Sequence, residues 1–139
     1  MEDTIFMKII NREIPAEIIH EDEDTLAFLD SHPINLGHAL VIPKVPSRNL
    51  LDINQESFAA VMKTVHKLTP VIKETVGADG INIQMNNEEP AGQAVFHTHV
   101  HIIPRFENDG YAHWQAKTPY NPSESSKLAE KLRAVLSIE

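Results

Sequence analysis

The chain of 139 residues contains no cysteine. This absence excludes a disulfide framework, a thiol nucleophile and a zinc site built from cysteines. Long apolar runs are also lacking. None approaches the roughly 18 residues of a membrane-spanning helix, so no membrane partner is expected. The N-terminus has neither the basic nor the apolar stretch of a signal peptide, and we therefore expect a cytoplasmic protein.

Basic residues are in deficit. There are 12 Lys and Arg against 20 Asp and Glu, which gives a formal net charge of −8. Binding to a nucleic acid backbone requires clustered Lys and Arg, so a nucleic acid polymer is not the expected partner. An acidic surface still permits a small phosphate ligand at a locally basic site.

The alternation of apolar and β-branched residues predicts an α+β fold. Five strands are expected, over 17–21, 25–30, 38–43, 81–85 and 95–103. Most of these strands adjoin in sequence, which favours an antiparallel sheet over a doubly wound parallel one.

Apolar residues at helical spacing predict three helices, over 4–12, 54–76 and 128–136. Asp3 is the expected cap of the first helix, and Gly77 is the expected end of the long one. Pro70 should kink the long helix or remove one of its hydrogen bonds. No repeat or linker divides the chain, so one domain over 1–139 is predicted.

Three histidines stand at alternate positions, His97, His99 and His101, in the last predicted strand. Successive strand side chains point to opposite faces, so the three imidazoles share one face and apolar residues occupy the other. A row of imidazoles is an unusual way to build a core. It indicates instead that several nitrogen bases are presented to one small ligand.

Two chemistries are open for this row. Three histidines on a strand cannot easily converge on one metal ion, because alternate residues lie roughly 6.5–7 Å apart. A site made of two histidines and a carboxylate from elsewhere stays open. The other chemistry is covalent catalysis, in which one imidazole attacks while its neighbours orient it and hold substrate oxygens. An elongated ligand such as a phosphate chain suits the row better than an ion does.

Four segments together resemble the histidine triad (HIT) family, in particular its Hint-type branch of nucleotide-binding phosphoramidases in a bacterial form. They are 3–15, 26–30, 37–44 and 92–105, and they follow in family order through most of the chain. Residues 106–139 match none of the motifs. The resemblance implies a HIT-like fold, a homodimer that pairs through the long helix and the strand before the triad, and no metal or cofactor. It implies a purine nucleotide as partner, AMP or GMP or their phosphoramidates.

The resemblance also implies a role for each histidine. His99 would attack the α-phosphorus and form a nucleotidyl-imidazole intermediate, which water then hydrolyses. His97 would orient His99, and His101 would reach a phosphate oxygen. His38 matches the fourth imidazole of the family's active site.

Further positions match the family's nucleotide contacts. Asp30 stands where relatives hold the ribose, although an Asx-turn is a rival interpretation. The polar or small residues implied near the phosphates and the leaving group are Asn86, Gly92, Gln93 and Ala94. The apolar lining implied for the base is Phe6, Ile9, Ile14 and Phe28.

The remaining signals are weaker. Met7 stands where some bacterial relatives carry a cysteine of a structural zinc site, so no such site is expected. Trp114 with His113 is a candidate for a substrate or dimer surface. Two other functions stay open, hydrolysis of dinucleoside polyphosphates and a nucleotide-binding scaffold whose hydrolysis is vestigial.

Overall fold

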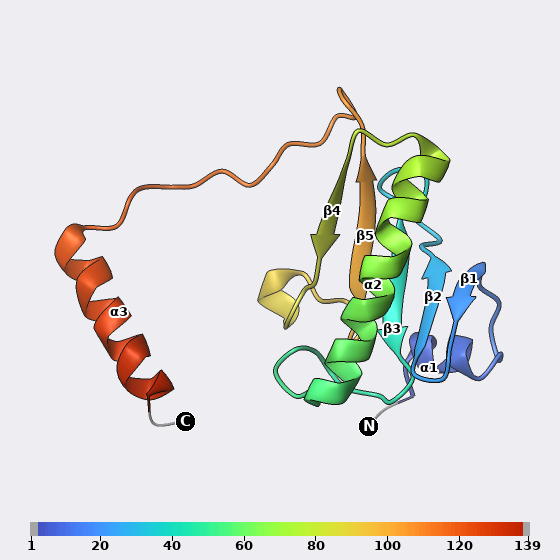
Figure 1. Cartoon of the computed structure of the whole chain (residues 1–139), viewed down its shortest axis with the longest axis horizontal. Helices are drawn as coiled ribbons and strands as arrows, with labels where there is room; N and C mark the ends of the chain where they lie inside the picture. The colour runs from blue at the N-terminus through green and yellow to red at the C-terminus, as the bar shows by residue number, and fades with distance from the viewer. Residues whose placement is uncertain (1–2, 138–139) are drawn as a thin grey trace. The chain divides into compact units, whose positions relative to one another are not determined.

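The computed structural model describes residues 3–137 and divides the chain into two units, Met1–Asp109 and Gly110–Glu139. All the strands and the family motifs lie in the first unit (Figure 1). The second unit contains helix α3 (Pro122–Leu136), which begins after the Asn121 side chain accepts a hydrogen bond from the Ser123 amide. None of the residues of α3 is buried. Helix α3 therefore belongs to a compact unit of its own, and the single domain over 1–139 stays a prediction.

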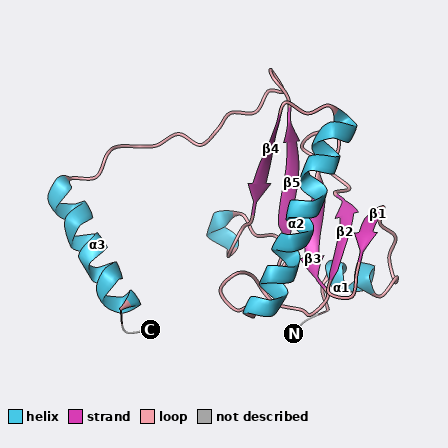
Figure 2. Cartoon of the chain, viewed as in Figure 1, coloured by secondary structure: helices cyan, strands magenta, loops and turns pink. Residues whose placement is uncertain are grey.

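The first unit is built on a five-stranded antiparallel sheet, as predicted. Its strands are β1 (Ile18–Glu21), β2 (Thr25–Leu29), β3 (Ala39–Pro43), β4 (Gly80–Gln84) and β5 (Val100–Arg105). Their order across the sheet is β1-β2-β3-β5-β4, and every neighbouring pair is antiparallel (Figure 2). Strand β4 lies at one edge, so pairing with a second chain there stays a prediction.

One face of the sheet is covered by α2 (Gln55–Val76), which crosses the strands in Figure 1. The buried stripe of α2 includes Val61, Val65, Leu68 and Ile72, which pack against apolar residues of β2, β3 and β5. Gly77 ends the helix in the left-handed conformation, as expected. Among residues 3–137, no helix is long and apolar enough to cross a membrane.

Pro70 lies inside α2, and the helix continues through it. The missing N–H would have bonded to the carbonyl of His66. Pro70 and His66 are both exposed, so water can satisfy that carbonyl.

The opposite face of the sheet carries the short helix α1 (Ile5–Ile10). Its cap is Thr4 rather than the predicted Asp3, because the Thr4 hydroxyl accepts the Met7 amide at 3.3 Å. Phe6 and Ile9 on this helix pack into a second apolar cluster with residues of β2 and β3. This second face also holds the histidines.

Strand β5 begins five residues later than predicted, at Val100. The predicted strand over 95–103 fails at its start because its pairing with both neighbouring strands stops there, although β3 itself continues to Pro43. The last pair with β3 is Val41 with Val100, and the last pair with β4 is Gln84 with His101. The amide of Thr98 donates instead to the carbonyl of Ser47 at 2.8 Å. Only His101 of the three histidines is therefore in the strand.

Candidate active site

A cavity of about 790 Å³ opens on the face of the sheet that carries α1. Most of the predicted site residues line it, although they come from separate parts of the sequence. The lining includes Phe6, Ile9, Ile14, Phe28, Asp30, Asn86, Gly92, Ala94, His99 and His101. The predicted residues His38, His97 and Gln93 are buried and do not line it.

One end of the cavity is apolar and aromatic. The Phe6 ring lies edge-on to Phe28, with ring centroids 5.5 Å apart, and edge-on to His99 at 5.0 Å. Leu40 also lines the cavity and was missed by the sequence analysis. The sequence did contain a signal for Leu40, because it stands two positions after His38 and therefore points to the same face of the strand. In the structure, Leu40 pairs with His101 across the sheet.

The tautomer of His99 is assigned by its hydrogen bond. Its Nδ1 lies 2.7 Å from the carbonyl oxygen of His97. A carbonyl oxygen only accepts, so Nδ1 carries the proton and Nε2 keeps its lone pair. His99 is only 7% exposed, yet it lines the cavity. Its ring therefore has the form required of a nucleophile.

His97 orients His99 with its backbone rather than with its ring. The His97 ring is completely buried, and its Nε2 lies 2.9 Å from the carbonyl oxygen of Pro43 at the end of β3. This bond anchors the segment before β5, so that the His97 carbonyl meets the His99 ring. The Nδ1 of His97 is buried and has no hydrogen-bond partner among the described residues.

His38 and His101 form a directed chain of hydrogen bonds. The Ile34 amide donates to Nδ1 of His38 at 3.0 Å, so the His38 proton is on Nε2. That Nε2 lies 2.9 Å from Nδ1 of His101, which accepts. The proton of His101 is consequently on Nε2, where it is available to an oxygen of a ligand. His38 thus acts through His101.

Asp30 follows β2. It makes the contact of an Asx-turn, which the sequence analysis gave as the alternative to ribose binding. Its Oδ1 accepts the His32 amide at 2.9 Å. Its Oδ2 lies 3.6 Å from Nε2 of His38, and the residue lines the cavity. The two interpretations are compatible, because one carboxylate oxygen holds the turn and the other has capacity for a ligand.

The site left open from the sequence, two histidines of the row with a carboxylate, is not what the structure brings together; the cluster found contains His101 of the row, His38 and Asp30. Single ligand atoms of Asp30, His38 and His101 lie within 4.8 Å of one another. His38 would have to offer Nε2, which the Ile34 hydrogen bond keeps protonated. Moving that proton to Nδ1 would set two N–H groups against each other. The hydrogen bonding therefore opposes metal binding at this point.

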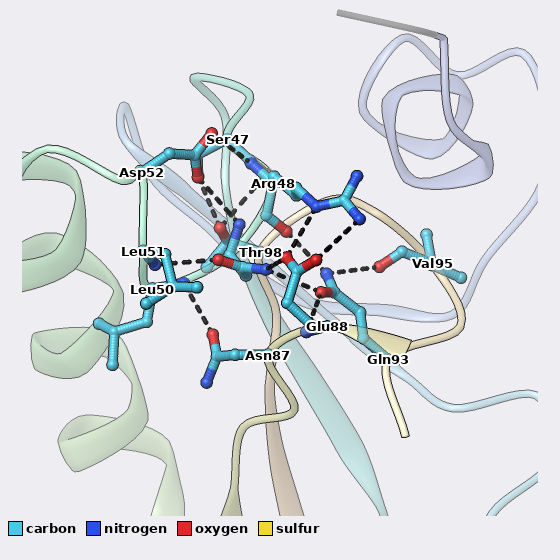
Figure 3. A network of polar contacts seen from close by, with 11 residues as sticks. Ser47, Arg48, Leu50, Leu51, Asp52, Asn87, Glu88, Gln93, Val95 and Thr98 are labelled. Atoms are coloured by element: carbon cyan, nitrogen blue, oxygen red, sulfur yellow. Dashed lines mark hydrogen bonds and ion pairs between the residues drawn. The ribbon is translucent and has the colours of Figure 1, made fainter. Parts of the chain in front are cut away.

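Figure 3 shows the polar network that holds the segment before the triad, and Gln93 is at its centre. The Oε1 of Gln93 accepts from Asn49 Nδ2 at 3.0 Å and from the Glu88 amide at 2.9 Å. Its Nε2 donates to the carbonyls of Arg48 at 2.7 Å and Val95 at 3.1 Å. These four bonds use the whole capacity of the amide, so Gln93 positions the loop instead of meeting the phosphates.

The loop that precedes Gln93 contributes smaller groups to the cavity. Gly92 has φ of +94°, and a Cβ there would lie 3.4 Å from Nδ2 of Asn86. Asn86 itself accepts from Gln84 at 3.1 Å and donates to the Gly92 carbonyl at 3.4 Å. Gly92, Asn86 and Ala94 therefore form a narrow wall beside the histidines.

Burial keeps all four imidazoles neutral. It is the largest cause lowering the pKa of His38, His97, His99 and His101. Burial, together with the nearby charges of His99 and His38, lowers the pKa of His101 to about 4. The donors offered to a ligand at neutral pH are thus neutral N–H groups.

We expect stability to fall on mild acidification. In the unfolded chain these histidines take up protons near pH 6.5, whereas the folded chain resists protonation, in the case of His101 down to about pH 4. The unfolded state then binds more protons, so the free energy of unfolding should decrease as the pH falls from about 6.5 toward 4. Urea unfolding across this range measures the slope. His101→Asn should reduce the slope, and equal slopes for the two proteins would contradict the burial argument.

Comparisons with known proteins show which proteins this chain is similar to. The model of the HIT domain matches residues 11–108. Protein hit of Bacillus subtilis is 40% identical over 138 residues, which cover 94% of this chain and 95% of that protein. Adenosine 5'-monophosphoramidase hnt1 of Schizosaccharomyces pombe is 36% identical, covering 92% of this chain and 94% of that one. Adenylylsulfatase HINT3 of Arabidopsis thaliana is 40% identical over 77% of this chain and 54% of its own length.

A solved structure agrees over nearly the whole chain. The crystal structure of SMU.412c from Streptococcus mutans is 40% identical, with a TM-score of 0.93, and the match covers 98% of this chain and 87% of that one. The fold described above thus matches that solved structure, and the family model covers residues 11–108. This chain belongs to the HIT family.

Proposed function

We propose that the chain is a hydrolase that attacks the α-phosphate of purine nucleoside phosphoramidates or related nucleotides through a covalent intermediate on His99. The observation that carries the proposal is the tautomer of His99, whose Nε2 is left unprotonated in a residue that lines the cavity. Relatives named as a phosphoramidase and an adenylylsulfatase support nucleotide hydrolysis at the level of the family.

In the first step, Nε2 of His99 attacks the α-phosphorus and an N–P bond forms. The bond from phosphorus to the leaving group breaks, and its electron pair departs with that group. The His99 ring becomes positively charged, so its Nδ1–H bond to the His97 carbonyl strengthens as the transition state forms. Nε2–H of His101 donates to a phosphate oxygen and stabilises the charge that develops there.

In the second step, water attacks the phosphorus of the intermediate. The water gives up a proton to the solvent as its oxygen bonds to phosphorus. The N–P bond breaks, its electron pair returns to Nε2 of His99, and the nucleoside monophosphate is released. Neither step takes a group from outside the substrate and water. The low polarity around the buried imidazoles strengthens both hydrogen bonds.

The shape of the cavity supports a purine nucleotide. Phe6, Ile9, Ile14 and Phe28 give an apolar end, where a larger ring system buries more apolar surface. Asp30 separates this end from the histidines in the proposed binding mode and accepts a ribose hydroxyl. The phosphate then meets His99 and His101.

A substrate panel tests the proposal. Adenosine and guanosine phosphoramidates are assayed beside dinucleoside polyphosphates, each with and without EDTA. We expect turnover of the phosphoramidates at rates that EDTA does not change. Turnover of none of them, or its loss with EDTA, would refute the proposal, and faster turnover of dinucleoside polyphosphates would move the chain to another branch of the family.

Replacing Asp30 should weaken ribonucleotide binding selectively. Asp30→Asn keeps an oxygen for the His32 amide and removes the charge that accepts from the ribose. Loss of such a charged hydrogen bond should raise the Kd for AMP about 10- to 100-fold, and the Kd for the deoxy analogue should rise less. Calorimetric titration measures both values. Equal weakening would show that Asp30 does not contact the sugar.

A further inference from the structure

A second cavity of about 810 Å³ adjoins the nucleotide cavity. The two share the walls formed by Ile5, Ala94 and Val95. None of the four histidines lines the second cavity, whose character is set by charged side chains of α1 and of the loop after β3. A group that crosses the small side chain of Ala94 passes from one cavity into the other.

Two of the charged residues in the second cavity are already committed to the fold. The Arg48 guanidinium makes two hydrogen bonds to Glu88, at 2.8 and 3.0 Å, and stacks over the Phe96 ring at 4.2 Å. The carboxylate of Asp52 accepts the amides of Arg48 at 3.1 Å and Asn49 at 3.0 Å. Glu88 largely balances Arg48, so this pair adds little net charge.

Lys8 is different. Its exposed side chain lines the second cavity, and within residues 3–137 its ammonium makes no hydrogen bond or ion pair. The Nη1 group of Arg48 also makes no hydrogen bond within this part of the chain. Asp3 is the one lining carboxylate that opposes them without a hydrogen bond of its own in the described residues. The uncommitted donors therefore favour an oxyanion.

The direction of the reaction adds to this argument. Displacement at phosphorus proceeds roughly in line, so the leaving group lies on the side away from the attacking nitrogen. The two cavities meet at Ile5, Ala94 and Val95, so a leaving group that departs toward this wall reaches the second cavity.

We propose that this second cavity is the leaving-group subsite of the enzyme and that Lys8 is a specificity-determining residue, which favours oxyanion leaving groups over amines. The inference rests on the proposed function. When a P–O bond to a sulfate breaks, the electron pair moves to the departing oxygen and its negative charge grows next to Lys8. When a P–N bond to an amine breaks, the electron pair moves to the nitrogen, which takes up a proton from the solvent, so no negative charge remains there. Lys8 lowers the barrier only in the first case.

The test compares two leaving groups on one nucleotide. We measure kcat/KM for adenosine 5'-phosphosulfate and adenosine 5'-phosphoramidate with the wild-type chain, Lys8→Gln and Lys8→Arg. Lys73→Gln removes an equal charge from the exposed surface of α2 and is the matched control. Lys8→Gln should lower kcat/KM for the phosphosulfate by about 3- to 15-fold, which lies between the values for exposed and buried charged hydrogen bonds. The ratio of the two substrates should return toward wild type in Lys8→Arg.

The outcomes separate the two proposals. A selective loss with the phosphosulfate, absent from Lys73→Gln, supports the subsite. Turnover of both substrates with the same ratio in the wild type and Lys8→Gln overturns the subsite and leaves the hydrolase intact. Turnover of neither substrate by the wild type overturns the hydrolase and the subsite together.

Discussion

Replacing His99 with alanine is expected to lower kcat by at least about 10²–10⁴-fold, the loss typical of removing a positioned proton-transfer group, and by more where the covalent route closes. No neighbouring nitrogen can substitute for its Nε2. The His97 ring is fully buried and makes its hydrogen bond to the carbonyl of Pro43. Nδ1 of His101 accepts a hydrogen bond from His38, and its Nε2 carries the proton. Nucleotide affinity should survive, because the apolar end and Asp30 are unchanged. Steady-state kinetics and AMP binding measure the two effects separately.

Matched histidine variants give the controls. His66→Ala removes an exposed imidazole from α2 and should leave turnover unchanged. His101→Ala should cost less than His99→Ala, since water can replace part of its hydrogen bond to a phosphate oxygen. Near-wild-type turnover in His99→Ala would remove the nucleophile from the mechanism.

Gln93→Leu is expected to have the largest effect on stability. Leucine keeps much of the volume of the side chain and removes all four hydrogen bonds shown in Figure 3. The buried Asn49 side chain then loses a partner, as do the part-buried Glu88 amide and the carbonyls of Arg48 and Val95. Each unsatisfied buried group costs about 1–3 kcal/mol, and relaxation around the site recovers part of this, so we expect the free energy of unfolding to fall by about 2–4 kcal/mol.

Gln84→Leu is the control for this substitution. Gln84 is half-buried and makes a single side-chain hydrogen bond, to Asn86 at 3.1 Å. Its loss should cost about 0.5–1.5 kcal/mol at most, the net value of one ordinary hydrogen bond. Urea unfolding of both variants measures the two losses in the free energy of unfolding. A smaller loss for Gln93→Leu than for Gln84→Leu would show that the network does not hold the loop.

The sequence predicted well those features that depend on local signals. The long helix has a capping side chain at Asn54, an apolar stripe and Gly77 at its end, and all three act within a few residues. The hairpin of β1 and β2 and the apolar strand β3 are local in the same sense. The motif residues that line the nucleotide cavity were predicted by resemblance, since nothing local shows that Phe6 lies against His99.

The features that sequence reasoning missed depend on partners distant in the chain. Strand β5 begins at Val100 because its pairing with β3 and β4 stops there, and the sequence of the triad does not show where that pairing stops. Gln93 resembled a phosphate contact, but two of its four hydrogen-bond partners, Arg48 and Asn49, come from the loop after β3. The tautomer of His97 is set by the distant carbonyl of Pro43. The tautomers of His38 and His99 are set by nearby backbone groups of Ile34 and His97, whose orientation the sequence does not show.

Rapid quenching of a single turnover tests the central claim most directly. The wild-type chain is mixed with an adenosine phosphoramidate labelled in the base, stopped within the first turnover, and digested for mass spectrometry. The account predicts a nucleotidyl group attached to His99, which forms before free AMP and is absent from His99→Ala. AMP released at the full rate without any adduct, or an adduct on another residue, would contradict it.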